Sequence, residues 1–174
     1  EKILQKNFLN GIEDEAIKKK LRKKVKKLKA DEGAGGQYIE WDKRPKKLSR
    51  WIWDTNLKGI IQHQTRSHME SDLRRYFFVA CWAEEKKISP GLRHFPKVLL
   101  PDHKNVKKTG NGKNAEAEDQ YEFADRFRAQ VKGKPATTIT SHISKDGHYF
   151  IHFDPTQGRS LTVREAARLQ TFPD

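Results

Sequence analysis

The sequence predicts an α+β fold in which helices come first, a small antiparallel sheet with a hairpin follows late, and a short capped helix lies at the C-terminus. Two observations lead to this fold class. Apolar residues recur at helical spacing in the first half of the chain, and after residue 120 they alternate with a period of two. At 174 residues the chain is long enough to bury a hydrophobic core of its own.

The first predicted helix covers residues 12–30. Its apolar stripe consists of Ile17, Leu21, Val25 and Leu28, which recur at the spacing of one helix face. The basic residues of segment 18–24 either contact phosphates or form a solvated helix face, and the solvated face is the more common meaning of such a run. The glycine-rich segment 31–36 then ends the helix and predicts a flexible joint.

The second predicted helix begins at Ser71, a favourable N-cap residue, and ends at Lys86. Its broad apolar face places it in the core, and Cys81 lies on that face. We therefore predict that Cys81 is a buried structural thiol rather than a nucleophile. Upstream of this helix, a group of tryptophans predicts a packed aromatic cluster, with stacking on an exposed base as the alternative. The tryptophans are Trp41, Trp51 and Trp53.

Residues 106–120 lack apolar periodicity and are rich in glycine, asparagine and charged residues, which predicts a mobile loop. Basic loops on a rigid scaffold often carry residues that read DNA, but an ordinary surface insertion is an equal alternative. Beyond this loop, alternation predicts strands at 126–131 and 148–153, and the β-branched residues of 137–144 predict another. Asp146 and Gly147 predict the hairpin turn that joins the last two strands.

The last predicted helix has a start that is written out in the sequence. Thr162 is the expected N-cap, Glu165 completes a capping box, and Leu161 and Ala166 are placed as a hydrophobic staple. Pro173 follows as a stop signal. These residues leave unexplained why the remaining positions of the segment are arginine and glutamine.

Charge is the strongest bulk signal. There are 36 Lys and Arg against 23 Asp and Glu, which gives a net charge of +13. Such a surface favours a polyanion, with nucleic acid as the leading candidate and a generic basic surface as the alternative. The single cysteine excludes an intrachain disulfide and suits a reducing cytoplasm. No apolar run predicts a membrane span. A chain that begins at Glu1, with Met69 as its only methionine, is expected to be part of a longer one.

Two polar clusters remain open from the residues alone. His142, His148 and His152, with Asp146 and Asp154 between and after them, suggest a metal site. The spacing fits no metal motif, so hydrogen-bonded histidines are the better interpretation and we predict no metal.

The second cluster is "QHQTRSH", residues 62–68, which joins amide, imidazole and guanidinium groups. Its Arg66 either grips a phosphate or a guanine edge, or ties down the start of the second helix through an acidic neighbour. The sequence does not distinguish between these two roles of Arg66.

The last forty residues resemble a known family. "PATTITSHISKDGHYFIH" followed by "RSLTVREAARLQTFPD" is similar to the C-terminal part of bacterial DNA cytosine-5 methyltransferases, and the second stretch resembles their ninth conserved block. "HQTRSHMESDLRRYFF" and "LRHFPKVLLPDHKNV" look like the variable region of one subgroup, with lower specificity. The positions that match the ninth block are Arg159, Leu161, Thr162, Arg164, Glu165, Ala167, Arg168, Leu169, Gln170, Phe172, Pro173 and Asp174.

The resemblance implies an enzyme of restriction-modification systems that flips a cytosine out of duplex DNA and methylates its C5 carbon with S-adenosylmethionine. The family's cofactor loop, its Pro-Cys nucleophile and its final block are missing from this sequence, and Cys81 is not preceded by proline. We therefore expect no catalytic residue in this chain, no bound S-adenosylmethionine, and no activity by itself. Duplex DNA and the catalytic domain of the same protein are the expected partners, in the bacterial cytoplasm.

The resemblance divides the chain into a basic helix and joint at 1–36, a target-recognition region at 37–158 and the ninth block at 159–174. The expected DNA-binding residues are Arg66, Lys107, Lys108, Lys113, Ser141, His142, Lys145 and His148. The expected structural residues, which pack against the catalytic domain, are Arg159, Thr162, Arg164, Glu165, Arg168 and Gln170. A non-enzymatic nucleic-acid-binding module and a protein-interaction domain with an acidic partner are the alternative functions.

Overall fold

The computed structural model describes residues 6–29, 33–40, 54, 56–101 and 125–173, and within these it confirms the α+β class. The helices are α1 (Lys6–Asn10), α2 (Glu15–Val25), α4 (Glu70–Lys86) and α5 (Val163–Leu169). Short 3-10 helices are η1 (Leu92–His94), η2 (Lys97–Leu99) and η4 (Ser141–Ser144). Strands β1 (Ile39–Glu40) and β2 (Gly59–Ile60) pair antiparallel, with Ile39 opposite Ile60.

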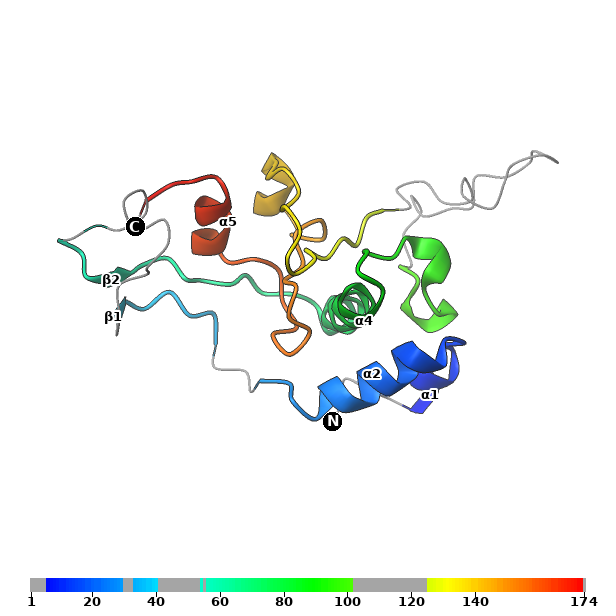
Figure 1. The fold of residues 1–174 in the computed structure, drawn as a ribbon. Helices are drawn as coiled ribbons and strands as arrows, with labels where there is room; N and C mark the ends of the chain where they lie inside the picture. The colour runs from blue at the N-terminus through cyan, green and yellow to red at the C-terminus, as the bar shows by residue number, and fades with distance from the viewer. Residues whose placement is uncertain (1–5, 30–32, 41–53, 55, 102–124, 174) are drawn as a thin grey trace.

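Helix α4 is the centre of the hydrophobic core (Figure 1). Most of its middle is fully buried, including Tyr76, Phe77, Phe78 and Cys81. Helix α2 packs along one side of α4, while the β1–β2 pair and α5 lie at the other end of the molecule. Segments outside α4 also contribute residues to this core: Phe8, Ile12, Ile17, Leu21, Leu92, Phe95, Leu99, Phe127, Ala129 and Ile151.

The first predicted helix is confirmed, but it is shorter than the apolar stripe suggested. The carboxylate of Asp14 caps α2 by accepting a hydrogen bond from the Ile17 N–H at 3.1 Å, so the helix begins after residue 14. It ends at Val25, beyond which the N–H of Lys29 donates to the carbonyl of Thr156 at 3.1 Å. The last residues of the predicted helix are therefore drawn onto the C-terminal part of the chain.

The second predicted helix is also confirmed, with a different start. Met69 rather than Ser71 is the N-cap of α4, and its carbonyl accepts the N–H groups of Asp72 and Leu73. No side chain caps this end. The first turn is instead stabilised by Asp72, which is buried and pairs with Arg75 at 2.8 Å, so the cap prediction for Ser71 is wrong.

The predicted late strands are not formed. Residues 126–131 and 148–153 do lie side by side, but they are joined by an isolated parallel bridge between Ala129 and Ile151. A second isolated bridge pairs Ile151 antiparallel with Ser160. Segment 137–144 ends in the 3-10 helix η4 instead of a strand. The hairpin turn at 144–147 is wrong as well, because Asp146 accepts the N–H of His148 in a local turn at 3.0 Å.

The described part of the glycine joint is paired rather than free. The carbonyl of Ala34 accepts the N–H of Thr65 at 2.8 Å, and the N–H of Gly36 donates to the carbonyl of His63. A side chain at Gly35, whose φ is +77°, would come within 2.7 Å of the His63 carbonyl oxygen. Only glycine permits this approach.

Among the described residues, no helix has the length and apolar character needed to cross a membrane.

Candidate nucleic-acid interface

Residues 141–147 form a surface loop that begins with η4, and we name it the recognition loop. Its tip carries Ser141, His142 and Lys145, all of which are exposed. The ring of His142 packs edge-on against Tyr149, with ring centroids 5.7 Å apart. Within the described residues, the side chains of Ser141 and Lys145 have no hydrogen-bond partner. The tip therefore offers a hydroxyl, an imidazole and an ammonium group to a ligand.

Arg66 holds the recognition loop from one side. Its Nη1 donates to the carbonyl of Ile143 at 3.2 Å, and its Nη2 donates to the carbonyl of Ser144 at 2.7 Å. These carbonyls belong to the last turn of η4, where a cation is also favoured by the local dipole. Arg66 is half-buried and comes from the segment before α4, so it ties the loop to the scaffold.

Tyr76 holds the other end of the recognition loop from the middle of α4. Its hydroxyl donates to the carbonyl of Asp146 at 3.1 Å and lies 2.7 Å from Nδ1 of His148. His68 joins the same network, with its Nδ1 3.3 Å from the Tyr76 hydroxyl and its Nε2 2.9 Å from the hydroxyl of Ser160. Burial raises the pKa of Tyr76, so its hydroxyl stays protonated.

The histidines of this network are held neutral. Burial lowers the pKa of His68 to about 4, although the charge of Asp72 opposes the shift. Burial likewise lowers the pKa of His148, which is only 6% exposed. Both rings are therefore available as hydrogen-bond partners rather than as cations. His148 was expected to bind DNA, but its ring is covered by the core.

Gly147 closes the recognition loop at its C-terminal end. Its φ of +72° lies in the left-handed region, and a Cβ there would come within 2.9 Å of the Ser160 side chain. Any larger residue would push the loop away from the segment that contains Ser160. Glycine is therefore required for the loop to lie against the scaffold.

The C-terminal segment has the predicted capping box. Thr162 Oγ1 accepts the N–H of Glu165, and Glu165 accepts the N–H of Thr162 at 2.8 Å. Arg159 adds a bidentate ion pair to the same carboxylate, at 2.7 Å and 2.9 Å. Burial alone would raise the pKa of Glu165, but these hydrogen bonds and the Arg159 charge outweigh it and lower the pKa to about 2.

Arg164 does not pair with its neighbour Glu165. Its buried guanidinium donates to the carbonyls of Ile61 at 3.0 Å and Pro173 at 2.6 Å, and to the side chain of Gln62 at 3.3 Å. The N–H of Arg164 also donates to the Gln62 carbonyl. Arg164 thus connects the start of α5 and Pro173, beyond its end, to residues 61–62, which precede Arg66 and α4.

A surface cavity of about 500 Å³ lies beside α5. Arg168 and Leu169 line it from α5, and Phe153 and the segment 130–136 line it from the other side. Arg168 is half-buried, whereas Gln170 is exposed at the C-cap.

The structure brings together only some of the predicted site residues. Arg66, Ser141, His142, Lys145 and His148 meet at the recognition loop. The loop at 106–120 with Lys107, Lys108 and Lys113, and the tryptophans at 41, 51 and 53, lie outside the described residues. The sequence analysis missed Tyr76, because an apolar helix face hides a tyrosine whose hydroxyl has a partner. Among the described residues, no group of three or more potential ligands is placed to hold a metal.

The sequence was also compared with known protein families. Residues 3–174 match the family model of C-5 cytosine-specific DNA methylases. The chain therefore belongs to this family, which confirms the resemblance of its C-terminal segment.

Three curated relatives are named type II methyltransferases, and the name of the second includes the word "putative". M.Bpa9945I of Bacillus paralicheniformis is 60% identical over 52 residues, 30% of this chain and 12% of the relative. M.OihORF3336P of Oceanobacillus iheyensis is 42% identical over 52 residues, 30% of this chain and 11% of the relative. M.AgeI of Thalassovita gelatinovora is 38% identical over 94 residues, which are 54% of this chain and 20% of the relative. The chain thus spans a fifth or less of these relatives. No solved structure matches it.

Proposed function

We propose that this chain is the target-recognition part of a DNA cytosine-5 methyltransferase of the type II class, which methylates cytosine in duplex DNA with S-adenosylmethionine. The observation that carries the proposal is the recognition loop. Ser141, His142 and Lys145 are exposed and polar, while Arg66 holds the middle of the loop and Tyr76 its C-terminal part. A rigid support with a polar tip is what reading of base edges requires, because each contact then loses little conformational entropy.

The residues of the recognition loop have different roles in this proposal. Lys145 and Ser141 contact the DNA directly, and His142 contributes its exposed ring edge. Arg66 is a positioning residue, since its guanidinium already serves two carbonyl groups of the loop. His148 supports the loop from within, because its ring is buried against Tyr76. Lys107, Lys108 and Lys113 remain proposed phosphate or base contacts.

The C-terminal segment has a separate role in the proposal. Residues 159–174 form the side that packs against the catalytic domain of the same protein, and the cavity beside α5 receives part of that domain. The exposed apolar side chains at this end support such a contact. They are Phe153, Val163, Leu169 and Phe172, each more than a third exposed.

The test is selection from a random pool of duplexes with the purified 174-residue chain at moderate salt. We expect enrichment of a short cytosine-containing motif. Lys145→Ala should weaken binding of that motif by about tenfold, the loss of one good base or phosphate contact. Arg66→Ala should leave binding to unrelated duplexes nearly unchanged but broaden the enriched motif, because the loop loses its fixed position.

Two outcomes of this selection would contradict the proposal. If the chain binds duplexes without enriching a motif, it does not read bases by itself. If it binds no duplex, an acidic protein partner is favoured instead. Arg66→Lys is the matched variant, since it keeps the charge but cannot donate in a fork to two carbonyl groups. It should broaden the motif almost as much as Arg66→Ala does. An unchanged motif in both variants would refute the positioning role.

We also propose that the chain transfers no methyl group by itself. Its single thiol, Cys81, is fully buried in α4. Burial raises the pKa of this thiol further, so it is not a thiolate at neutral pH. Incubation with labelled S-adenosylmethionine and the selected duplex should give no methylated cytosine. Cys81→Ser should bind the duplex as the unaltered chain does, and methylated cytosine formed by the unaltered chain alone would contradict this proposal.

A further inference from the structure

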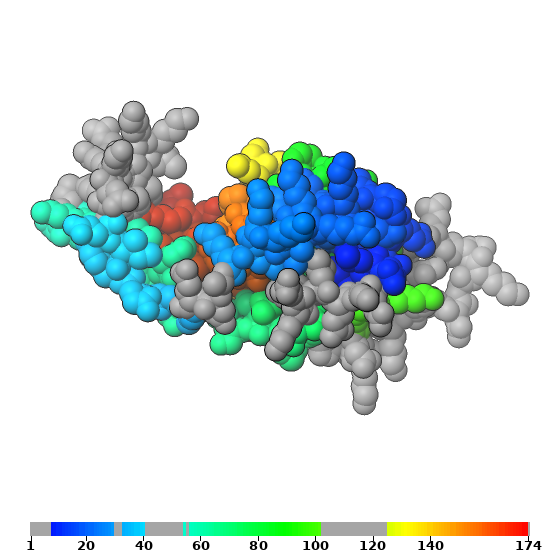
Figure 2. Space-filling model, turned by 90° about the horizontal axis from the view of Figure 1, so that it is seen from below, coloured from blue at the N-terminus to red at the C-terminus, as the bar shows by residue number. Residues whose placement is uncertain are grey.

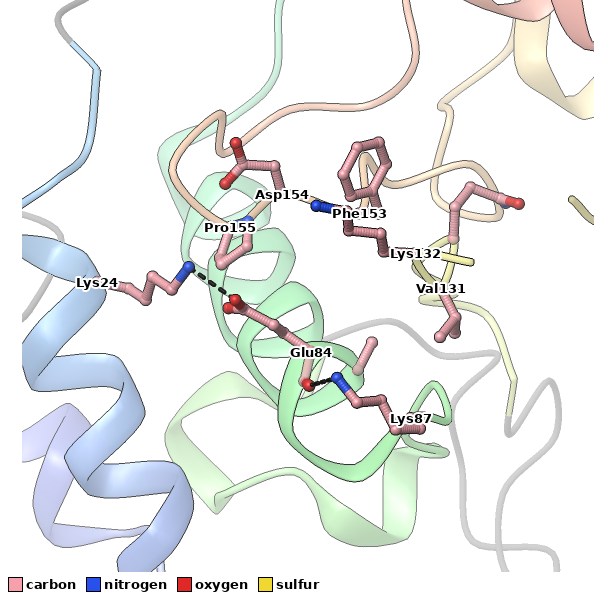
Figure 3. Close-up of a pocket in the computed structure, with 10 residues that line it drawn as sticks. Lys24, Glu84, Lys87, Val131, Lys132, Phe153, Asp154 and Pro155 are labelled. Atoms are coloured by element: carbon pink, nitrogen blue, oxygen red, sulfur yellow. Dashed lines mark hydrogen bonds and ion pairs between the residues drawn. The ribbon is translucent and has the colours of Figure 1, made fainter. Parts of the chain in front are cut away.

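The lysines of α2 fall into two groups that differ in their contacts. Lys20 and Lys24 face α4, where Lys20 lies 2.9 Å from Glu85 and Lys24 lies 2.8 Å from Glu84. Their side chains are only 22% and 19% exposed. Figure 3 shows Lys24 reaching across to Glu84 beside a pocket of about 260 Å³. These lysines hold the two helices together and are not free for a ligand.

The second group points away from α4, and we name it the basic stripe: Lys19, Arg22, Lys23 and Lys26, which is extended by Lys27 and Lys29. All six are exposed, and within the described ranges none has an acidic partner. No acidic residue occurs between residues 16 and 29. Figure 2 views the face over which α2 lies, with its blue side chains projecting into solvent.

The basic stripe is held in place at both ends. At the start of α2, Asp14 caps the helix and its carboxylate also lies 2.6 Å from Lys86 of α4. At the other end, Lys29 donates its N–H to Thr156. Ile17 and Leu21 are fully buried beneath the helix. Like charges are thus kept close together by packing, although their mutual repulsion opposes it.

The basic stripe and the recognition loop lie on opposite sides of α4. In Figure 1, α4 runs between α2 below it and the yellow 3-10 helix η4 above it. Glu84 and Glu85 of α4 contact α2, whereas Tyr76 contacts the recognition loop. The basic stripe and the recognition loop therefore face different directions from α4.

We propose that the basic stripe is a second DNA-binding surface, which binds the phosphates of a duplex segment other than the one that the recognition loop reads. This proposal rests on the proposed function. Charge complementarity carries it, because a duplex strand bears one phosphate per about 3.4 Å of axis. The distance along α2 from Lys19 to Lys26 is about 10 Å, so the stripe can face about three phosphates. Its long side chains are exposed and, in the described part of the chain, have no acidic partner that would fix them in place, so we expect them to contact phosphates without selecting a sequence.

The experiment compares the unaltered chain with a variant in which Lys19, Lys23 and Lys26 are all replaced by Gln. Binding to a long duplex that contains the selected motif is measured between about 50 and 200 mM salt. The logarithmic salt slope should become shallower by about 2 to 3, since each phosphate contact contributes about 0.9. Binding at the lowest salt should weaken at least about tenfold. The motif enriched from random duplexes should not change.

The matched control replaces three exposed lysines outside the stripe, with the substitutions Lys58→Gln, Lys97→Gln and Lys132→Gln. It removes the same charge, so its slope should change much less. Circular dichroism and melting temperature should match in all proteins, because the replaced side chains do not contribute to the core.

Three outcomes would overturn the inference. If the stripe variant keeps the slope and the motif, the basic stripe does not bind DNA while the proposed function stands. If the unaltered chain binds no duplex, both fail. If the variant keeps its DNA binding but loses affinity for polyglutamate, the stripe is a surface for an acidic protein.

Discussion

Replacing Glu165 with Gln is expected to destabilise the chain by about 2 kcal/mol at neutral pH. The glutamine can still accept the N–H of Thr162, as capping boxes allow, so the helix cap survives. What is lost is the charge that Arg159 grips at 2.7 Å and 2.9 Å. The pKa of Glu165 falls from 4.5 to about 2 on folding. At about 1.4 kcal/mol per unit this sets a ceiling of about 3 kcal/mol, which partial exposure lowers.

The pH dependence of this difference gives the sharper test. A carboxyl group whose pKa is lowered by folding adds stability above its unfolded pKa, and that stability disappears as the pH falls through the folded pKa. The difference between the unaltered chain and Glu165→Gln should therefore be full above about pH 5 and shrink between about pH 4.5 and pH 2. Urea unfolding at several pH values measures it. A difference that is the same at pH 3 and pH 7 would rule out the ion pair as its source.

Replacing Arg164 with Ala should have a similar or larger effect, about 2–4 kcal/mol, which lowers the melting temperature by about 6–12 °C. Its guanidinium donates to Ile61, Gln62 and Pro173, and these acceptors lose their charged donor together. Since Arg164 is 6% exposed, water does not readily replace it. Thermal unfolding followed by circular dichroism measures the change.

Arg164→Lys is the control for charge alone. A lysine keeps the positive charge but has one compact donor group, so it cannot reach acceptors on both ends of α5. We expect it to recover less than half of the lost stability. A lysine variant as stable as the unaltered chain would mean that charge, and not the fork of donors, carries the contribution of Arg164.

Helices α2, α4 and α5 were predictable because their signals are local. A buried stripe at helical spacing and a capping box need no knowledge of distant residues. The cap of α4 was not predictable in the same way. Ser71 is a good N-cap by type, but a buried pair between Asp72 and Arg75 fixes the first turn elsewhere.

The late strands were mispredicted because alternation reports burial and not pairing. Phe127 and Ala129 are buried as the alternation suggested, yet their partner is the segment around Ile151, in parallel bridging. Among the residues that the structure describes, no strand lies beside segment 137–144. The side chain of Gln130 accepts the N–H of Thr137 at 3.1 Å and donates to its hydroxyl at 2.9 Å, a substitute for a neighbouring strand.

The sequence predicted which residues belong to the candidate site, but not how they contact one another. Arg66 and the residues of 141–148 were singled out by type, and the structure brings them together across a long sequence separation. That Arg66 grips carbonyl groups, and that His148 is buried against Tyr76, depends on tertiary packing. No spacing rule within the sequence contains this information.

Under the proposed function, the two supports of the recognition loop have a consequence for changing the sequence that the chain prefers. Ser141 and Lys145 have no hydrogen-bonded side chains within the described structure, so the frame does not depend on their identity. Arg66, Tyr76 and Gly147, in contrast, determine where the loop lies. Under that proposal, a library restricted to Ser141 and Lys145 would sample new sequence preferences on an unchanged scaffold, and natural substitutions at these positions would change specificity without cost to folding.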